Sequence, residues 1–219
     1  MRKVVFGGAN SLDNYFARKD DSVDWLMFSN EVTEFLADYW KRFDTIVMGR
    51  RTYEVSLQMG GGGAYPGVKS YVFSKTLKTT PAPGVELISQ DVAEFVRKLK
   101  SEEGKDICVM GGGLLARSLF QADLIDEVGF NIHPVLLGSG IPIFHEIDHQ
   151  IDLDLLDCKT LKNGCVLVTY RVKPSGEKRK KAAKKASNSK NPAKAKTDAK
   201  TSKTKRSSQT KRSKKSLGR

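Results

Sequence analysis

The first 173 residues alternate short apolar runs with segments whose apolar positions recur every three or four residues. Runs rich in β-branched and aromatic residues predict strands, and the helical spacing predicts amphipathic helices with one face toward a sheet. Strands are expected at residues 3–8, 45–48, 70–74, 85–88, 106–110 and 127–134, and helices at 29–43, from 50 onward, at 91–100 and at 114–121. Strands that alternate with helices indicate an α/β fold with helices on both faces of the sheet.

Two further strand-like runs, residues 152–162 and 165–173, are joined by Asn163-Gly164. Asn-Gly is typical of a two-residue hairpin turn, and that register places Cys158 opposite Thr169. The sheet is therefore expected to be mixed and mainly parallel, with a C-terminal antiparallel hairpin. The same register argues against a disulfide between Cys158 and Cys165, so the chain is expected to be reduced and intracellular.

Charge is distributed very unevenly along the chain. Residues 174–219 hold 18 Lys and Arg and two acidic residues, a net charge of +16, whereas residues 1–173 hold 20 basic and 23 acidic residues, a net charge of −3. The C-terminal segment also lacks Trp, Tyr, Phe, Ile, Val and Met, so it buries too little apolar surface to offset the entropy of ordering it. We therefore expect one globular domain, residues 1–173, and a disordered Lys-rich basic tail, residues 174–219.

The tail is expected to bind DNA or RNA without reading a base sequence, because its lysines neutralise phosphates and release counterions. The alternative is a solubilising extension. The first apolar run ends at Gly7, too soon for a signal peptide, and the longest uncharged stretch, residues 128–144, contains Pro134 and Pro142. These features predict a cytoplasmic protein that enters no membrane, with nucleoid association through the tail as a further option.

Three segments at predicted strand ends carry groups that bind phosphate. Gly111–Gly113 and Gly49–Thr52 each lie between a strand and a helix, and Ser74-Lys75 follows a third strand. Free N–H groups at a helix N-terminus attract anions, and guanidinium groups bind phosphate through paired hydrogen bonds. For each segment alone, the alternative is a packing turn or a solvated surface pair. Because ligands of open α/β sheets collect at strand ends, the three together predict a phosphate site.

Several segments then give a family resemblance by their order and spacing. They are Val47–Glu54, Val72–Lys75, Val109–Gly113, Leu124–Glu127 and Pro134–Phe144. As a set they resemble the dihydrofolate reductase superfamily. Ser11–Ala17, with Val23–Leu26, looks more like the branch related to the C-terminal reductase domain of the bifunctional riboflavin-biosynthesis deaminase-reductase. The resemblance covers residues 2–173 and implies an NADPH-binding reductase with a dihydrofolate-reductase-like sheet. Relatives in the superfamily often dimerise through that sheet, so a homodimer is compatible with it.

The resemblance also implies roles for particular residues. Those implied to hold the phosphates of NADPH are Gly49, Arg50, Arg51, Thr52, Ser74, Lys75, Gly111, Gly112, Gly113, Leu114 and Leu115. Ala9 and Asn10 are implied to lie against the nicotinamide end of the cofactor and to contact the substrate. Asp13 is implied to lie beside the substrate and is the catalytic candidate. Glu31 is the candidate for the carboxylate that anchors a pterin ring. Asn14 stands where glycine is usual, and Asn is the ordinary residue that best tolerates a positive φ.

His145-Glu146-Ile147-Asp148-His149 spells the H-E-x-x-H motif of zinc proteases. That motif needs a sustained helix and a third ligand, whereas this segment follows Pro142 and precedes a polar loop. We therefore expect structural loop histidines and no metal site.

The expected function is transfer of a hydride from NADPH to a C=N or C=O group of a small pteridine- or aminopyrimidine-like substrate. In such a reaction the protein mainly orients the reactants and excludes water. The alternative is a non-catalytic nucleotide-binding body whose basic tail binds DNA or RNA.

Overall fold

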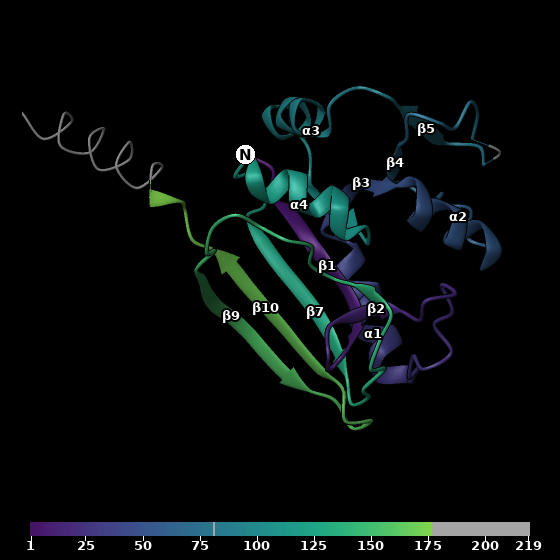
Figure 1. The fold of residues 1–219 in the computed structure, drawn as a ribbon, viewed down its shortest axis with the longest axis vertical. Helices are drawn as coiled ribbons and strands as arrows, with labels where there is room; N and C mark the ends of the chain where they lie inside the picture. Colours follow the sequence, from purple (N-terminus) through teal and green to yellow (C-terminus); the bar gives the residue numbers. More distant parts are fainter. Residues whose placement is uncertain (81, 177–219) are drawn as a thin grey trace, which may run out of the picture. The chain divides into compact units, whose positions relative to one another are not determined.

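The computed structural model describes residues 1–80 and 82–176. The strands of its main sheet are β1 (Val4–Ser11), β3 (Phe43–Gly49), β4 (Lys69–Phe73), β5 (Val85–Ile88), β6 (Asp106–Met110), β7 (Glu127–His133), β9 (Leu153–Thr160) and β10 (Val166–Val172). Their order is β5-β4-β3-β6-β1-β7-β10-β9 (Figure 1). The strands from β5 to β7 are parallel, β10 is antiparallel to β7, and β9 is antiparallel to β10. The predicted mixed, mainly parallel sheet with a C-terminal hairpin is confirmed.

Helices cover both faces of this sheet, as predicted. They are α1 (Asn30–Trp40), α2 (Arg50–Gln58), α3 (Val92–Ser101) and α4 (Gly113–Gln121). The side chains of successive β1 residues alternate between the faces, because a strand has a period of two. Val4 and Phe6 join the core under α3 and α4, whereas Val5 joins the core that includes Tyr53 of α2.

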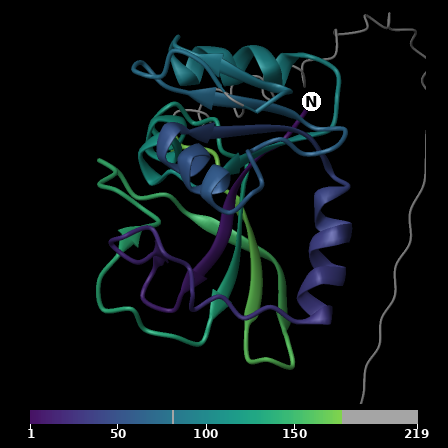
Figure 2. The ribbon, with the colours of Figure 1, turned by 90° about the vertical axis from the view of Figure 1, so that its right-hand side faces the viewer.

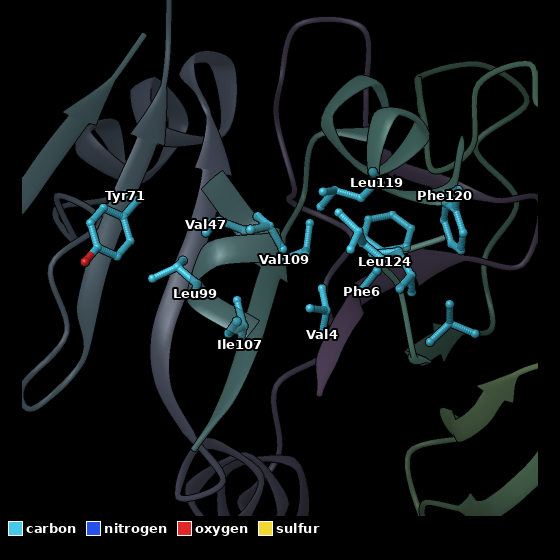
Figure 3. Close-up of a cluster of buried hydrophobic side chains, with 14 of the residues drawn as sticks. Val4, Phe6, Val47, Tyr71, Leu99, Ile107, Val109, Leu119, Phe120 and Leu124 are labelled. Atoms are coloured by element: carbon cyan, nitrogen blue, oxygen red, sulfur yellow. The ribbon is translucent and has the colours of Figure 1, made fainter. Parts of the chain in front are cut away.

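The core under α3 and α4 holds the larger cluster of buried side chains. Figure 3 shows Leu119 and Phe120 of α4 lying against Phe6 of β1, with Leu99 of α3 near the neighbouring strands. Phe6 also makes an edge contact with Phe130, at 5.8 Å between ring centroids. This packing fixes α4, and therefore its N-terminus, against the centre of the sheet.

A second, two-stranded sheet pairs β2 (Tyr15–Ala17) with β8 (Ile141–Pro142). It lies on the opposite side of β1, β7 and β10 from α1, as Figure 2 shows. The first strand was expected at residues 3–8, but β1 extends to Ser11 because β7 pairs with it as far as His133. Asn14 adopts a φ of 67°, so the predicted turn conformation is confirmed.

The register of the closing hairpin differs from the prediction by one residue. Cys158 lies opposite Val168, not Thr169, and the N–H of Leu161 donates to the carbonyl of Cys165 at 2.8 Å. The turn therefore has three residues, and Gly164 takes the left-handed conformation with a φ of 85°. A type I turn followed by a left-handed glycine is the usual three-residue solution. All three cysteines are free.

The predicted domain boundary at residues 173/174 lies three residues before the end of the described chain, and residues 177–219 of the predicted basic tail lie outside the described residues. The boundary and the tail both stay predictions. In the part of the chain that the structure describes, no helix is long and apolar enough to cross a membrane.

Candidate active site

A cleft of about 670 Å³ opens at the carboxyl ends of β3, β4 and β5. The N-termini of α2 and α4 and the segment before α3 form its other walls. It is lined by ten of the eleven residues predicted to hold the cofactor: Gly49, Arg50, Arg51, Thr52, Ser74, Lys75, Gly112, Gly113, Leu114 and Leu115. The eleventh, Gly111, packs on Thr52, since a Cβ there would lie 2.8 Å from Thr52 Oγ1. The fold thus brings the three predicted phosphate segments together.

Two helices present free N-termini to this cleft. Neither α2, which begins after Gly49, nor α4, which begins after Gly112, has a side-chain cap or an acidic residue in its first turn. The other two helices are closed, because Ser29 caps α1 at 3.3 Å and Asp91 caps α3 at 2.9 Å. Uncapped backbone N–H groups and the positive end of the helix dipole favour a bound anion.

The glycines at the start of α4, Gly112 and Gly113, let its backbone line the cleft directly. Gly112 takes a φ of 68°, a conformation that side chains rarely adopt. At Gly113 a Cβ would lie 2.5 Å from the carbonyl oxygen of Ile143 and 2.8 Å from the ring of His145. A side chain at either position would disturb the first turn of α4.

Three cations stand at the cleft. Arg51 Nε pairs with Asp21 Oδ1 at 2.7 Å, and Arg50 Nη1 pairs with Glu54 Oε1 at 3.7 Å. The two arginine side chains are 53% and 57% exposed, so both guanidinium groups remain accessible to a ligand. Lys75 follows Ser74, whose hydroxyl accepts the backbone N–H groups of Thr76 and Leu77 at 3.1 and 3.0 Å and closes the turn after β4.

A second hollow, a cavity of about 370 Å³, lies between α1 and the face of the sheet that α1 covers. It is lined by Gly7, Gly8, Ala9, Leu26, Met27, Phe28, Val32, Phe35, Leu36, Tyr39, Trp40, Met59, Cys108, Met110, Gly129, Phe130, Asn131, His133, Leu167, Val168 and Thr169. Met110, at the end of β6, lines this cavity, and Gly112 lines the cleft. The lining of the cavity and that of the cleft therefore come within two residues of each other along the chain, at the carboxyl end of β6.

The ionisable groups of the cavity are held in their neutral forms. Burial raises the pKa of Tyr39, raises the pKa of Cys108 to about 12, and lowers the pKa of His133. His133 is 1% exposed, and its Nδ1 accepts the backbone N–H of Met27 at 3.2 Å. An accepting Nδ1 places the proton of the neutral ring on Nε2.

The predicted substrate residues are only partly brought together. Ala9 lines the cavity, and Asn10 is buried beside it in β1, with its amide donating to the carbonyl of Ser11 at 2.8 Å. Glu31 does not line the cavity; its carboxylate accepts the backbone N–H of Lys162 at 3.0 Å and anchors α1 to the closing hairpin.

Asp13 lines neither the cavity nor the cleft. Its carboxylate accepts the N–H groups of Leu137 and Gly138 at 3.1 and 2.7 Å. The Ser11 hydroxyl, and then these two N–H groups, hold the pKa of Asp13 below its ordinary value. In this arrangement Asp13 is an ionised acceptor that fastens the loop after β7 to the turn after β1.

Sequence reasoning missed several residues of both hollows. His145 lines the cleft, although we expected a structural loop residue, and the segment 145–149 forms no helix. Its contact with Gly113 depends on the path of the loop after β8, which has no local signal. Tyr39, Asn131 and His133 line the cavity. The sequence did contain a signal for these three residues. Asn131 and His133 lie at alternate positions of β7 and so face the same side of the sheet, and Tyr39 lies on the apolar face of α1. No group of His, Cys, Asp and Glu in residues 1–80 and 82–176 is arranged to hold a metal ion.

Known proteins share this fold. The chain is 35% identical over 159 residues, 72% of its length and 91% of the relative, to the uncharacterized protein YwjB of Bacillus subtilis (strain 168). It is 27% identical, with a TM-score of 0.69, to a protein from Shewanella sp. PV-4 that carries a provisional assignment to riboflavin biosynthesis; the match covers 79% of this chain and 99% of that one. The dihydrofolate reductase of Enterococcus faecalis, solved with NADP(H), shares the fold at 19% identity and a TM-score of 0.58, over 78% of this chain and 96% of that one.

The family model of the RibD C-terminal domain matches residues 2–167. This match spans most of the chain and includes both the cleft and most of the cavity-lining strands. It confirms the branch indicated by the opening segment of the sequence. The chain belongs to the RibD C-terminal domain family.

Proposed function

We propose that this protein is an NADPH-dependent reductase that transfers a hydride to a C=N or C=O group of a small ring compound. Membership of the RibD C-terminal domain family supports a reductase, and a structural neighbour is a dihydrofolate reductase solved with NADP(H). The observation that carries the proposal is the cleft. It places two uncapped helix N-termini beside Arg50, Arg51 and Lys75.

The cleft fits the phosphates of NADPH by its donor set. The N–H groups at the start of α4 would hold the pyrophosphate, because their helix dipole and their lack of a cap favour an anion. Arg50 and Arg51 would hold the 2′-phosphate, which NADH lacks, since a guanidinium matches a phosphate bidentately. When bound, NADPH would supply the hydride. The residues of this chain would bind it, orient it and exclude water.

The cavity fits the other half of the reaction. Its lining residue Met110 lies two positions before Gly112 of the cleft, and the sheet forms its inner side. A planar ring would pack against its aromatic walls, with water excluded by α1. The pteridine- or aminopyrimidine-like rings implied by the resemblance are one class of such compounds.

The test is nucleotide binding to the full chain, measured by calorimetric titration with NADPH and with NADH. We expect micromolar affinity for NADPH and a dissociation constant at least about tenfold higher for NADH, since one phosphate held by charged hydrogen bonds contributes about 1.5–3 kcal/mol. Equal affinity for the two nucleotides would remove the 2′-phosphate assignment. Absence of binding for both would overturn the proposal.

A further inference from the structure

His145 forms the wall of the cleft at the point where α4 begins. A Cβ on Gly113, the first residue of α4, would lie 2.8 Å from Cδ2 of His145. The imidazole ring therefore lies against the first turn of the helix, and its Nε2 is bonded to the carbon nearest that turn. The ring is half-buried and lines the cleft, so an anion bound at this end of the helix would contact it.

The first turn of α4 has three backbone N–H groups that find no acceptor in the described part of the chain. They belong to Gly113, Leu114 and Leu115, and the first N–H that bonds within the helix is that of Ala116, which donates to the carbonyl of Gly112 at 3.0 Å. Free N–H groups at a helix N-terminus bind anions. His145 is the ionisable side chain that the loop after β8 adds to the lining of the cleft here.

The ring of His145 differs from those of the other two histidines in its partners. His133 Nδ1 accepts the backbone N–H of Met27 at 3.2 Å, and His149 Nδ1 lies 2.7 Å from Asp148 Oδ1. Neither ring nitrogen of His145 makes a hydrogen bond or an ion pair with residues 1–80 or 82–176. Both nitrogens are therefore available to a ligand in the cleft.

The elements packed around His145 carry charges of both signs. The charged residues that share the lining of the cleft are Arg50 and Arg51 of α2, Lys75 after β4 and Asp91 before α3. Those of α4 and of the loop itself are Arg117, Glu146 and Asp148. The pyrophosphate of a nucleotide would add two negative charges beside the ring, and an anion close to an imidazole favours its protonated form. Histidine is the side chain that ordinarily changes charge between pH 5 and 8.

The geometry points to His145 as a ligand of the nucleotide pyrophosphate that takes up a proton when the nucleotide binds. This inference rests on the proposed function. It assigns His145 a role that Arg50 and Arg51 do not share, because the 2′-phosphate proposed for the arginines is absent from NADH, whereas both nucleotides carry the pyrophosphate. The protonated ring donates a charged hydrogen bond to a phosphate oxygen, beside the free N–H groups of α4. Affinity for the pyrophosphate therefore rises as the pH falls.

The experiment measures NADH binding to the full chain by calorimetry between pH 8 and pH 6.5. NADH is the probe because its pyrophosphate keeps its charge over this range, whereas a phosphate monoester such as the 2′-phosphate of NADPH titrates near about pH 6. We expect the dissociation constant to fall at least about threefold from pH 8 to pH 6.5, because a charged hydrogen bond is stronger than a neutral one. Titrations in two buffers of different ionisation enthalpy should show uptake of about half a proton per nucleotide at pH 7.

Three variants test whether the proton is taken up by His145. His145→Gln keeps a hydrogen-bond donor without a titrating charge, so proton uptake should vanish and affinity should stay near its value at pH 8. His145→Lys keeps a positive charge at every pH of the series, so the dependence on pH should also vanish, but with NADH bound more tightly than by His145→Gln. His149→Gln is the matched control, because His149 is exposed in the same loop and does not line the cleft; it should leave both measurements unchanged.

The outcomes separate this inference from the proposed function. NADH binding without proton uptake, or uptake that persists in His145→Gln, would overturn the role of His145 and leave the reductase proposal standing. Binding of neither nucleotide would overturn both. Proton-linked NADH binding that is lost in His145→Gln, together with equal affinity for NADPH and NADH, would support His145 as a pyrophosphate ligand and refute the 2′-phosphate assignment.

Discussion

The two arginines of the cleft give the sharpest test of how this protein distinguishes NADPH from NADH. We consider Arg50→Ala, Arg51→Ala and the double variant. Both side chains are more than half exposed, and each already lies near an acidic partner, Glu54 or Asp21. On binding the nucleotide, each arginine would therefore exchange its carboxylate partner for a phosphate. Water would partly screen the charges at this exposed site.

This geometry sets the expected magnitude. A hydrogen bond to a charged group contributes about 1.5–3 kcal/mol when shielded, and an exposed ion pair about 0.2–1 kcal/mol. For half-exposed guanidinium groups we take about 1 kcal/mol each. The NADPH dissociation constant should then rise about fivefold in each single variant and about 30-fold in the double variant. NADH, which has no 2′-phosphate, should change less than about twofold.

The assay is titration of nucleotide fluorescence at two ionic strengths, since screening should shrink the NADPH effect at high salt. Arg97→Ala is the control, because Arg97 is exposed on α3, does not line the cleft, and loses the same charge. Replacing both cleft arginines by lysine should give an intermediate loss, because the charge stays but the paired hydrogen bonds do not. An equal loss for NADPH and NADH, or a loss in Arg97→Ala of the same size, would refute the reasoning.

Three further predictions concern other parts of the chain. Gly113→Ala should lower the free energy of unfolding by about 1–3 kcal/mol through overpacking and weaken NADPH, measured by urea unfolding and titration; unchanged values would contradict the tight contact. The folded state holds the pKa of His133 below 6.5, so the unfolded chain binds more protons below that pH. The free energy of unfolding should therefore fall on acidification, and it should fall less in His133→Gln. Parallel pH profiles of the two proteins would count against this reasoning. Removing residues 174–219 should abolish DNA binding at low salt and leave NADPH affinity unchanged; DNA binding by residues 1–173 alone would exclude the tail as its source.

Local patterns in the sequence were sufficient for most of the secondary structure. The strands at residues 85–88 and 106–110 have the predicted bounds, and α1 and α3 begin within one residue of the predicted starts. Such features depend on residues within one or two turns of each other, so a linear pattern contains the information. The clustering of the three predicted phosphate segments in one cleft also followed, because parallel strands place their carboxyl ends at one edge.

Tertiary structure decided what those patterns leave open. Asp13 and Glu31 were expected near the substrate, yet one fastens a loop and the other a hairpin turn, because each meets backbone N–H groups more than 100 residues away in sequence. The uncharged cavity arises where α1 crosses four strands, so no single segment encodes it. The sequence by itself determined most of the elements, the family and the meeting of three strand ends in one cleft, whereas the pairing of β2 with β8 came only with the tertiary structure. The cavity belongs to long-range packing, which alone brings β7, β10 and α1 together.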